Sequence, residues 1–426
     1  MIRPITGPHG IGFCSDEQQP KFTKLYREEN LGRYWNYYVT TAHQEWPEHY
    51  EVRDNYVIDG FSPNLNKSLH AGHLRQLAVA NSLKGLLNYG PKKAKFVSIL
   101  GASQGVYKYA TDALQGWFDF LEYKPEVYYD VLMPRDETIV PRRKVDDPDN
   151  KLHGCEIWDG PADPVIVVRA DGRPTYAFHD IAFAKVVSPT HYVTGAEQRE
   201  HFINLGLGDK HLSMGLILGA DGKKLKSRGG SDEAKAETIM EEVMGNLNEC
   251  PEKRKLAWNV LAWNFLQVSR SQNVKYNPAE WTKTDAPGMY ITYTYARVKK
   301  ALTGIGWCHI PPHQMKCIKK GLGNEETYSA WDGQKEPDPV FDLTQDDADL
   351  IGFSNYYHYY RRRSVETMDS TQMATFTHDL ARKLGKAYHK EKIQGGRYGF
   401  QYAVNYANFM LGRCLYSLGM FNLEQV

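Results

Sequence analysis

Residues 56–90 read YVIDGFSPNLNKSLHAGHLRQLAVANSLKGLLNYG, and this stretch decides the fold of the chain. It opens with the apolar run 56–58, which suits a buried strand. It then passes through turn-forming residues to His70 and His73, with Gly72 between them. Apolar residues recur after that at helical spacing, up to a Gly-Pro pair. The stretch predicts a strand, a loop and an amphipathic helix.

The junction between this strand and this helix has the chemistry of a phosphate-binding site. Free backbone N–H groups at a helix N-terminus favour anions, and open α/β sheets bind ligands where their strands end. The imidazoles of His70 and His73 can donate hydrogen bonds to phosphate oxygens, and Gly72 lacks the Cβ that would hold a nucleotide base off the backbone. Taken alone, the tetrapeptide also fits a surface helix whose histidines are solvated.

Composition sets broad limits on the class of protein. The 426 residues are 42% hydrophobic and 24% charged, which is typical of a globular protein with about two or three domains. A net charge of +1 provides no overall basic field that would announce a nucleic acid. Six cysteines without a CxxC pair favour a reducing cytosol over a disulfide framework. Because there is no long apolar run, we predict a cytoplasmic protein without a membrane span or signal peptide.

Strand and helix patterns alternate along residues 55–235, which predicts an α/β fold with a doubly wound parallel sheet of the Rossmann type. The segment from about 120 to 165 is rich in Pro, Asp and Arg, so we expect an insertion there, with 134–164 as a loop between two halves of the sheet. The other expected elements are a strand at 94–100, a helix at 108–121, a strand at 126–133, a strand, turn and helix within 163–187, a strand at 190–195 and a helix at 197–207.

Strand patterns fade after about residue 232, and helical spacing takes over. We therefore expect an all-α region after the α/β domain, with 347–363 as one of its helices. Aromatic residues crowd the segment before residue 54. We interpret them as part of a helix packed on the core, with stacking on RNA bases as the alternative. The predicted divisions are a short N-terminal extension at 1–54, a catalytic domain at 55–235, a helical connection at 236–303, a loop or linker at 304–341 and a helical domain at 342–426.

A second informative segment is the glycine-rich and lysine-rich loop GADGKKLKSRGG at 219–230. Lysines on a mobile, glycine-flanked loop can follow the β- and γ-phosphates of a nucleotide and neutralise a departing pyrophosphate. Lys223, Lys224 and Lys226, followed by Ser227, supply that chemistry. Taken alone, a solvated basic loop explains the pattern equally well.

Together, the two motifs resemble the paired motifs of class I aminoacyl-tRNA synthetases, and the segments between them resemble arginyl-tRNA synthetases in particular. The matches occur in family order, and the helices after residue 300 are compatible with the family. The matching segments are SPNLNKSLHAGHLR (62–75), DGRPTYAFHDIAFA (171–184), YVTGAEQREHF (192–202), GADGKKLKSRGG (219–230) and the tyrosine-rich YITYTYARVKK (290–300).

The resemblance implies an arginine–tRNA ligase. In that reaction the arginine carboxylate attacks the α-phosphate of ATP, which arrives with Mg²⁺ as a substrate, and arginyl-adenylate and pyrophosphate form. The arginyl group then passes to the terminal ribose of tRNA(Arg). Positioning and charge stabilisation dominate such chemistry. The implied partners are L-arginine, ATP and tRNA(Arg), and we expect a monomer with no tightly bound cofactor and no metal ligands.

The resemblance also implies roles for the residues that match its motifs. His70 and His73 would stabilise the α-phosphate during attack, and Gly72 would admit the adenine. Lysines would act on the phosphates, with Lys226 holding the pyrophosphate and Lys67 reaching in from the other side. The ATP site would be completed by Lys223, Lys224 and Ser227.

Arginine needs carboxylates for its guanidinium group and polar groups for its α-amine. By the resemblance, Asp180 and Tyr176 are the best guanidinium partners, and their four-residue spacing puts them on one face if the segment is helical. A surface salt bridge is the alternative for Asp180. The resemblance adds Asp59, Asn64 and Gln198 to the arginine pocket. It also implies tRNA contacts in the helix that opens the anticodon-binding module, at Tyr290, Tyr293 and Arg297.

Two features depart from the family pattern. The turn at 101–105 lacks the family's usual aspartate, and only about sixty residues precede the first motif. The alternatives are therefore an arginine-adenylating paralogue with a non-tRNA acceptor and a non-catalytic tRNA-binding relative. Cys308, His309, His313 and Cys317 match no common zinc-finger spacing, and a linker is the favoured interpretation.

Overall fold

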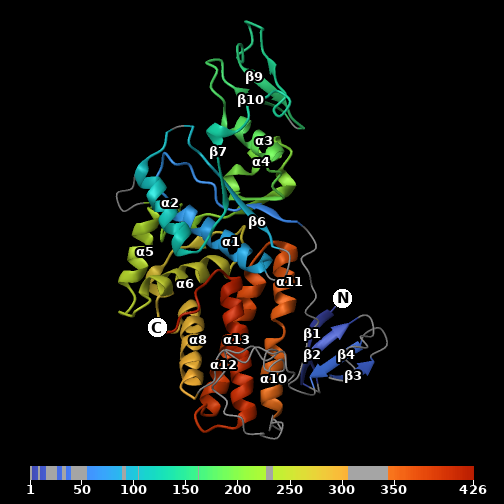
Figure 1. The fold of residues 1–426 in the computed structure, drawn as a ribbon, viewed down its shortest axis with the longest axis vertical. Helices are drawn as coiled ribbons and strands as arrows, with labels where there is room; N and C mark the ends of the chain where they lie inside the picture. The colour runs from blue at the N-terminus through green and yellow to red at the C-terminus, as the bar shows by residue number, and fades with distance from the viewer. Residues whose placement is uncertain are drawn as a thin grey trace, which may run out of the picture.

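A small sheet, an α/β region and a bundle of helices make up the fold (Figure 1). The α/β sheet and the all-α region predicted from the sequence are confirmed. Within the described ranges, no helix is long and apolar enough to cross a membrane. The computed structural model describes residues 2–7, 10–15, 26–30, 35–39, 55–88, 93–103, 105–161, 163–226, 234–305 and 344–426.

Five parallel strands form the central sheet, in the order β12-β11-β5-β6-β7. Because β5 pairs with β6 on one side and with the much later β11 on the other, the strand order reverses at β5. Open α/β sheets bind ligands at such a point. The elements are β5 (Val57–Asp59), α1 (Ala71–Leu87), β6 (Lys95–Leu100), α2 (Lys108–Phe120), β7 (Glu126–Tyr129), α3 (Tyr176–Val186), β11 (His191–Gly195), α4 (Arg199–Asn204) and β12 (His211–Met214).

The insertion between β7 and α3 contains a small antiparallel sheet. β8 (Arg143–Lys144), β9 (Glu156–Asp159) and β10 (Pro164–Val168) pair in the order β10-β9-β8. Two predictions are therefore wrong: 134–164 is not simply a loop, and the strand within 163–187 does not join the central sheet. Only residues 160–163 separate β9 from β10. Parallel pairing needs a long crossover, so these strands pair antiparallel.

The described residues of the N-terminal segment form a four-stranded antiparallel sheet, so the helix predicted there is wrong for those residues. Aromatic and β-branched residues are enriched in strands, so an aromatic-rich segment favours a sheet when strands of similar length can pair. The sheet lies beside α10 (Gln345–Ser354), apart from the central sheet (Figure 1). Its strands are β1 (Ile2–Gly7), β2 (Gly10–Ser15), β3 (Tyr26–Asn30) and β4 (Trp35–Val39).

Helices dominate the chain after residue 234, as the spacing predicts. The segment 347–363 forms two helices, which corrects the prediction of one. The buried Asn355 lies at the break and accepts a hydrogen bond from the Tyr406 hydroxyl of α13, which holds the junction against its neighbour. The helices are α5 (Ala236–Gly245), α6 (Lys253–Leu266), α7 (Pro278–Trp281), α8 (Pro287–Thr303), α10 (Gln345–Ser354), α11 (Tyr357–Thr367), α12 (Thr371–Lys390) and α13 (Tyr398–Ser417).

A short parallel pair links the helical region to the α/β region. β13 (Ile217–Leu218) precedes the lysine loop and pairs with β14 (Val274–Lys275), which follows α6. The limits between domains stay predictions. Nearly all of the linker predicted at 304–341 lies outside the described residues, together with its cysteines and histidines.

Helix α1 is buried on nearly all sides, so the prediction of an amphipathic helix is wrong. The central sheet lies on one side of α1 and the helical bundle on the other, and its polar side chains find partners in both. Gln76 Nε2 donates to the Val193 carbonyl at 2.6 Å, and Asn81 Nδ2 donates to the Gly419 carbonyl at 3.0 Å. Periodicity missed this burial because satisfied polar groups are tolerated in a core.

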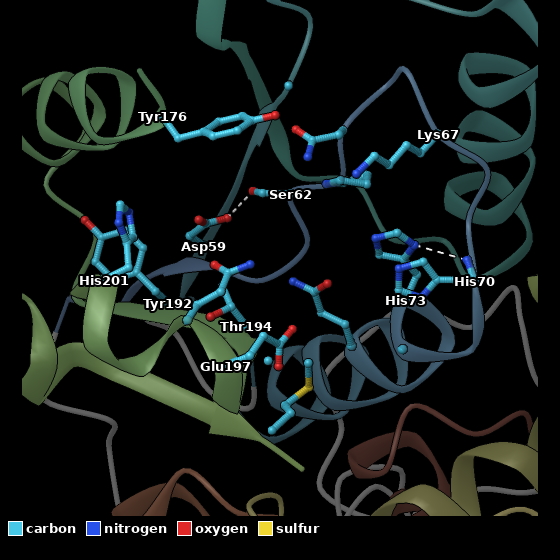
Figure 2. Close-up of a pocket in the computed structure, with 18 of the residues that line it drawn as sticks. Asp59, Ser62, Lys67, His70, His73, Tyr176, Tyr192, Thr194, Glu197 and His201 are labelled. Carbon is cyan, nitrogen blue, oxygen red and sulfur yellow. Dashed lines mark hydrogen bonds between the residues drawn. The ribbon is translucent and has the colours of Figure 1, made fainter. Parts of the chain in front are cut away.

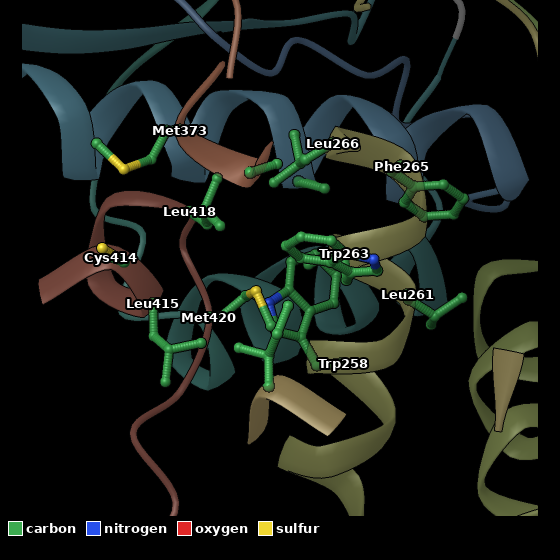
Figure 3. Close-up of a cluster of buried hydrophobic side chains, with 14 of the residues drawn as sticks. Trp258, Leu261, Trp263, Phe265, Leu266, Met373, Cys414, Leu415, Leu418 and Met420 are labelled. Carbon is green, nitrogen blue, oxygen red and sulfur yellow. The ribbon is translucent and has the colours of Figure 1, made fainter. Parts of the chain in front are cut away.

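The apolar core beneath α1 joins the two regions (Figure 3). Trp258 of α6 is fully buried, and its indole N–H donates to the Gly419 carbonyl at 2.9 Å. Leu415 of α13 and Leu418, just beyond that helix, are also fully buried. Since large apolar side chains supply most of the burial energy, this shared core holds α1 against the bundle.

A buried guanidinium, that of Arg75 in α1, adds a polar tie. Its Nη1 donates to the Gly215 carbonyl at 2.8 Å, and its Nη2 donates to the Arg270 carbonyl at 3.2 Å. The Asp369 carboxylate, from the turn between α11 and α12, accepts the Arg270 backbone N–H at 2.9 Å and the Ser269 hydroxyl at 2.8 Å. Burial lowers the pKa of Arg75 to about 10, and Asp369 acts against that change.

We expect Asp369→Ala to lower the free energy of unfolding by about 2–4 kcal/mol, because the Arg270 backbone N–H and the Ser269 hydroxyl lose their acceptor and the buried Arg75 cation loses a nearby negative charge. Urea denaturation near neutral pH measures the change. Glu241→Ala, at an exposed position of α5, is the control and should change stability by less than about 0.5 kcal/mol.

The same contribution should depend on pH. Burial by itself raises the pKa of Asp369, but hydrogen bonds from Thr371, Arg270 and Ser269 outweigh it, and the pKa lies below the ordinary value of 3.8. A lowered carboxyl pKa stabilises the fold fully above 3.8, and this stability is lost as pH falls through the folded-state pKa. An unfolding free energy difference between wild type and Asp369→Ala that stays constant into acid would contradict this assignment.

Candidate functional site

One cavity of about 450 Å³ opens at the carboxyl ends of β5, β6 and β11, beside the N-terminus of α1. Different side chains line its two ends. Lys67, His70 and His73 lie at one end, and Tyr176 and His201 lie at the other (Figure 2). The predicted site residues that line this cavity are Asp59, Asn64, Lys67, His70, Gly72, His73, Tyr176, Asp180, Gln198 and Lys224.

The two histidines of the first motif stack on each other at the start of α1. Their ring centroids lie 3.8 Å apart, with 24° between the ring planes. The His70 backbone N–H donates to Nδ1 of His73 at 3.1 Å, which leaves Nε2–H as the donor of a neutral ring. Burial, and then the charges of His70, Lys224 and Lys67, lowers the pKa of His73 to about 3. His73 is therefore an uncharged hydrogen-bond donor at neutral pH.

Gly72 provides the space that this stacking needs. A Cβ at this position would lie 3.1 Å from Cε1 and 3.2 Å from Nδ1 of His70. Both contacts are tight enough to displace the imidazole, so the position of His70 depends on the glycine. The role in admitting adenine stays a prediction, and the geometry adds this second reason for a residue without a side chain.

Asp59 ends β5 at the acidic end of the cavity and is only 4% exposed. The Ser62 hydroxyl donates to its Oδ1 and accepts the Ile99 backbone N–H at 2.8 Å. Burial raises the pKa of Asp59 to about 7; the Ser62 hydrogen bond lowers it, and the charge of Asp180 raises it further. Such a carboxyl can lose its proton when a cationic ligand arrives.

Tyr176 and Asp180 lie one turn apart on α3, as their spacing predicts, and both line the cavity. Asp180 also has a partner that we did not predict. Its Oδ2 lies 2.7 Å from Nε2 of His201 in α4, and both side chains are about one-third exposed. His201 belongs to the motif that contains Gln198, so its position three residues after a predicted pocket residue was an available signal.

Two acidic residues of the cavity also escaped sequence reasoning. The Glu197 carboxylate folds over Gly195, where a Cβ would lie 2.3 Å from both carboxylate oxygens. Asp130 accepts the backbone N–H groups of Ala102 at 2.8 Å and Ser103 at 3.0 Å. The turn that lacks an aspartate of its own is thus held by one from the neighbouring strand end, and no local pattern marks that pairing.

The lysine loop meets the cavity through Lys224. Lys223 and Lys226 are exposed and are not among the lining residues, and Ser227 lies outside the described residues. The Gly219 backbone N–H donates to the Lys223 carbonyl at 2.8 Å, which closes the turn before Lys224. The phosphate roles of Lys223, Lys226 and Ser227 stay predictions.

The predicted tRNA contacts lie on α8 in the helical bundle, on a different element from the cavity (Figure 1). The Arg297 guanidinium lies over the Tyr388 ring, 4.8 Å from its centroid. Tyr290 packs its hydroxyl against Gly385 of α12, where a Cβ would lie 2.3 Å away. Both residues therefore also hold α8 to α12, whereas Tyr293 is about half exposed.

Comparison with the sequences of known proteins finds proteins named arginine–tRNA ligase. A protein of Parabacteroides distasonis named arginine–tRNA ligase is 25% identical over 313 residues, which cover 65% of this chain and 48% of that protein. Another of that name, from Bacteroides thetaiotaomicron, is 24% identical over 265 residues, or 54% of this chain and 40% of that protein. The chain thus matches less than half the length of these relatives. No family model matches.

Solved structures share the fold at low sequence identity. The arginyl-tRNA synthetase of Thermus thermophilus superposes with a TM-score of 0.64 at 14% identity, covering 96% of this chain and 89% of that one. The Plasmodium falciparum arginyl-tRNA synthetase superposes with a TM-score of 0.62 at 13% identity, covering 94% and 86%. A methionyl-tRNA synthetase of Mycobacterium tuberculosis, solved with methionyl-adenylate, has a TM-score of 0.53 at 9% identity, covering 85% and 89%.

We expect Gly72→Ala to weaken ATP binding by about 10- to 100-fold, because the new Cβ displaces the ring of His70, which we predict to donate to the phosphates. Isothermal titration with ATP measures the affinity. The matched control is Gly116→Ala in α2, where a Cβ meets nothing within 4 Å. Equal affinities for wild type and Gly72→Ala would show that the stacked pair does not contact the nucleotide.

Proposed function

Because the chain belongs to the arginyl-tRNA synthetase family, we propose that it activates arginine with ATP and transfers the arginyl group to tRNA(Arg). The observation that carries this proposal is the division of charge within one cavity (Figure 2). Asp59 and Asp180 suit a guanidinium group, and Lys67 and His73 suit phosphates. One cavity lined by both kinds of side chain supports attack of the arginine carboxylate on the α-phosphate.

At the phosphate end, the chain would act through hydrogen bonds and charge. The nucleophile is an ionised carboxylate, so no side chain has to remove a proton from it. Nε2–H of His73 would donate to an α-phosphate oxygen and bind more strongly as negative charge develops there. Lys67 and Lys224 line the same end and would neutralise the triphosphate, which arrives with its Mg²⁺ as substrate.

At the amino-acid end, two carboxylates would receive the guanidinium group. His201 occupies Oδ2 of Asp180, so Oδ1 is the oxygen that would accept a guanidinium N–H. Asp59 would accept another, and the Tyr176 ring covers this end (Figure 2). A planar guanidinium can bridge two carboxylates, whereas the compact ammonium of lysine cannot match that geometry, which supports selectivity for arginine.

Two assays test the proposal: ATP–pyrophosphate exchange with every amino acid, in the presence and in the absence of tRNA, and tRNA charging with every amino acid. Charging of tRNA with arginine alone is the expected result. Exchange with arginine but without charging would instead indicate an adenylating paralogue with another acceptor. tRNA binding without either reaction would indicate a non-catalytic relative.

We expect His73→Ala to lower kcat by about 10²- to 10³-fold, because it removes a donor aimed at the developing charge. The affinity for tRNA should change little, since His73 lies inside the cavity rather than on the bundle. Filter binding measures that affinity beside the kinetic assay. His153→Ala, at an exposed position of the insertion, is the control. An equal loss of turnover and of tRNA affinity would count against the catalytic role.

Arginine should bind more tightly as pH rises through about 7. Burial holds Asp59 protonated below its pKa of about 7, and the guanidinium cation favours the ionised form. Affinity should therefore increase about ten-fold from about pH 6 to about pH 8, with release of a proton on binding below about pH 7. Calorimetry in two buffers of different ionisation enthalpy measures both quantities.

Asp59→Asn removes the titrating group and should bind arginine weakly, with an affinity that no longer follows pH. Asp112→Asn, at an exposed position of α2, should keep the wild-type profile. If Asp59→Asn retains the pH dependence, another group must titrate.

A further inference from the structure

Two buried polar side chains at the amino-acid end of the cavity have no assigned role. They are Tyr192 of β11 and His179 of α3, each 3% exposed and each part of the cavity lining. Within the described part of the chain, no hydrogen bond of normal geometry reaches the Tyr192 hydroxyl or either ring nitrogen of His179. Because a buried polar group without a partner costs free energy, such groups point to a ligand or to a buried water.

Tyr192 lies next to Asp59 on the neighbouring strand. The two residues are register partners in the parallel strands β11 and β5, so their side chains project from the same face of the sheet. Figure 2 shows Tyr192 at this end of the cavity with Asp59 and His201. Burial raises the pKa of Tyr192, and the charges of Asp59 and Asp180 raise it further. The hydroxyl therefore keeps its proton, and its oxygen can accept a hydrogen bond from a ligand.

His179 reaches the same end of the cavity from α3. It follows Tyr176 by three residues and precedes Asp180, so helical spacing puts all three on the cavity side. The Asp130 backbone is near the ring, but outside the geometry of a normal hydrogen bond. Burial lowers the pKa of His179, while the charges of Asp130 and Asp180 act against that change. The ring is neutral near pH 7, and one of its nitrogens can accept a hydrogen bond.

A guanidinium group brings more donors than the two carboxylates of this end can pair well. It has five N–H groups in one plane. One oxygen of each carboxylate already has a partner, which is the Ser62 hydroxyl at Asp59 and the His201 ring at Asp180. The two remaining oxygens leave N–H groups that need further acceptors.

We propose that the Tyr192 hydroxyl and the His179 ring accept these remaining N–H groups, and that the two residues thereby select a guanidinium substrate. The inference rests on the proposed function, which makes arginine the substrate. A site with buried hydrogen-bonding groups rejects a ligand that leaves them unpaired. The ammonium group of lysine has three donors on one atom and cannot reach acceptors that are spread around a plane.

Titration calorimetry tests this with Tyr192→Phe and His179→Phe, which keep a ring at each position and remove the acceptor. Each variant should bind arginine about ten- to 100-fold more weakly than wild type, because a hydrogen bond to a charged group is lost. Agmatine keeps the guanidinium group and lacks the carboxylate, so its affinity should fall by the same factor. The affinity for ATP should stay within about two-fold of wild type, because the phosphate end is unchanged.

Matched controls remove the same chemical groups away from the cavity. Tyr128→Phe removes a hydroxyl from β7 of the same sheet, and His153→Phe removes an imidazole from an exposed position of the insertion. Neither residue lines the cavity, so both variants should bind arginine as wild type does. Thermal melting of every variant confirms the fold.

An arginine affinity within about two-fold of wild type in either cavity variant overturns the proposal, because a buried water then suffices to pair that group. An equal loss of arginine and ATP affinity also overturns it, because the side chains then only support the fold. A wild type whose arginine binding depends on both groups, but which neither exchanges nor charges, contradicts the proposed function alone. Charging with arginine by an enzyme whose arginine binding depends on neither group contradicts this inference alone.

Discussion

The rest of this structure depends on one charged side chain that is buried in the protein interior. The Arg75 guanidinium lies in the interior, and backbone carbonyls from two separate segments, around Gly215 and Arg270, receive its hydrogen bonds. A buried cation without such partners would cost several kcal/mol. The contact therefore holds α1, the cavity strand end and the end of α6 in one arrangement. Asp369 extends it into the helical bundle.

Because of that arrangement, helix α1 contributes both to the cavity and to the core that it shares with the helical bundle. Its N-terminus presents His70 and His73 to the cavity, and its later turns lie in the core shared with the bundle (Figure 3). At Gly85 a Cβ would lie 2.2 Å from the Tyr416 carbonyl, so the helix and the end of α13 approach closely. A displacement of the bundle would therefore act directly on the helix that carries the histidines.

Burial has opposite effects on the two ends of the cavity, with one electrostatic result. It raises the pKa of Asp59 to about 7 and lowers the pKa of His73 to about 3, so both groups are biased toward their neutral forms. A ligand that places a cation beside Asp59 and an anion beside His73 supplies the charges that these neutral groups lack. The site thus favours a ligand pair of opposite charge, which agrees with arginine and a nucleotide.

Local patterns in the sequence determined much of the candidate site. Short-range periodicity and turn chemistry predict the strand, loop and helix around the histidine pair, the placement of Tyr176 and Asp180 four residues apart, and the parallel sheet. The lysine loop was equally visible, although Lys226 is not among the cavity-lining residues of the folded chain.

Tertiary structure alone decided the contacts between distant segments. Examples of such contacts are the hydrogen bond between Asp180 and His201, the support of the 101–105 turn by Asp130, and the burial of α1 on both sides. The antiparallel insertion is another. The physical reason is range: backbone sterics and periodicity act over a few residues, whereas such partners meet only after the sheet and the bundle have packed.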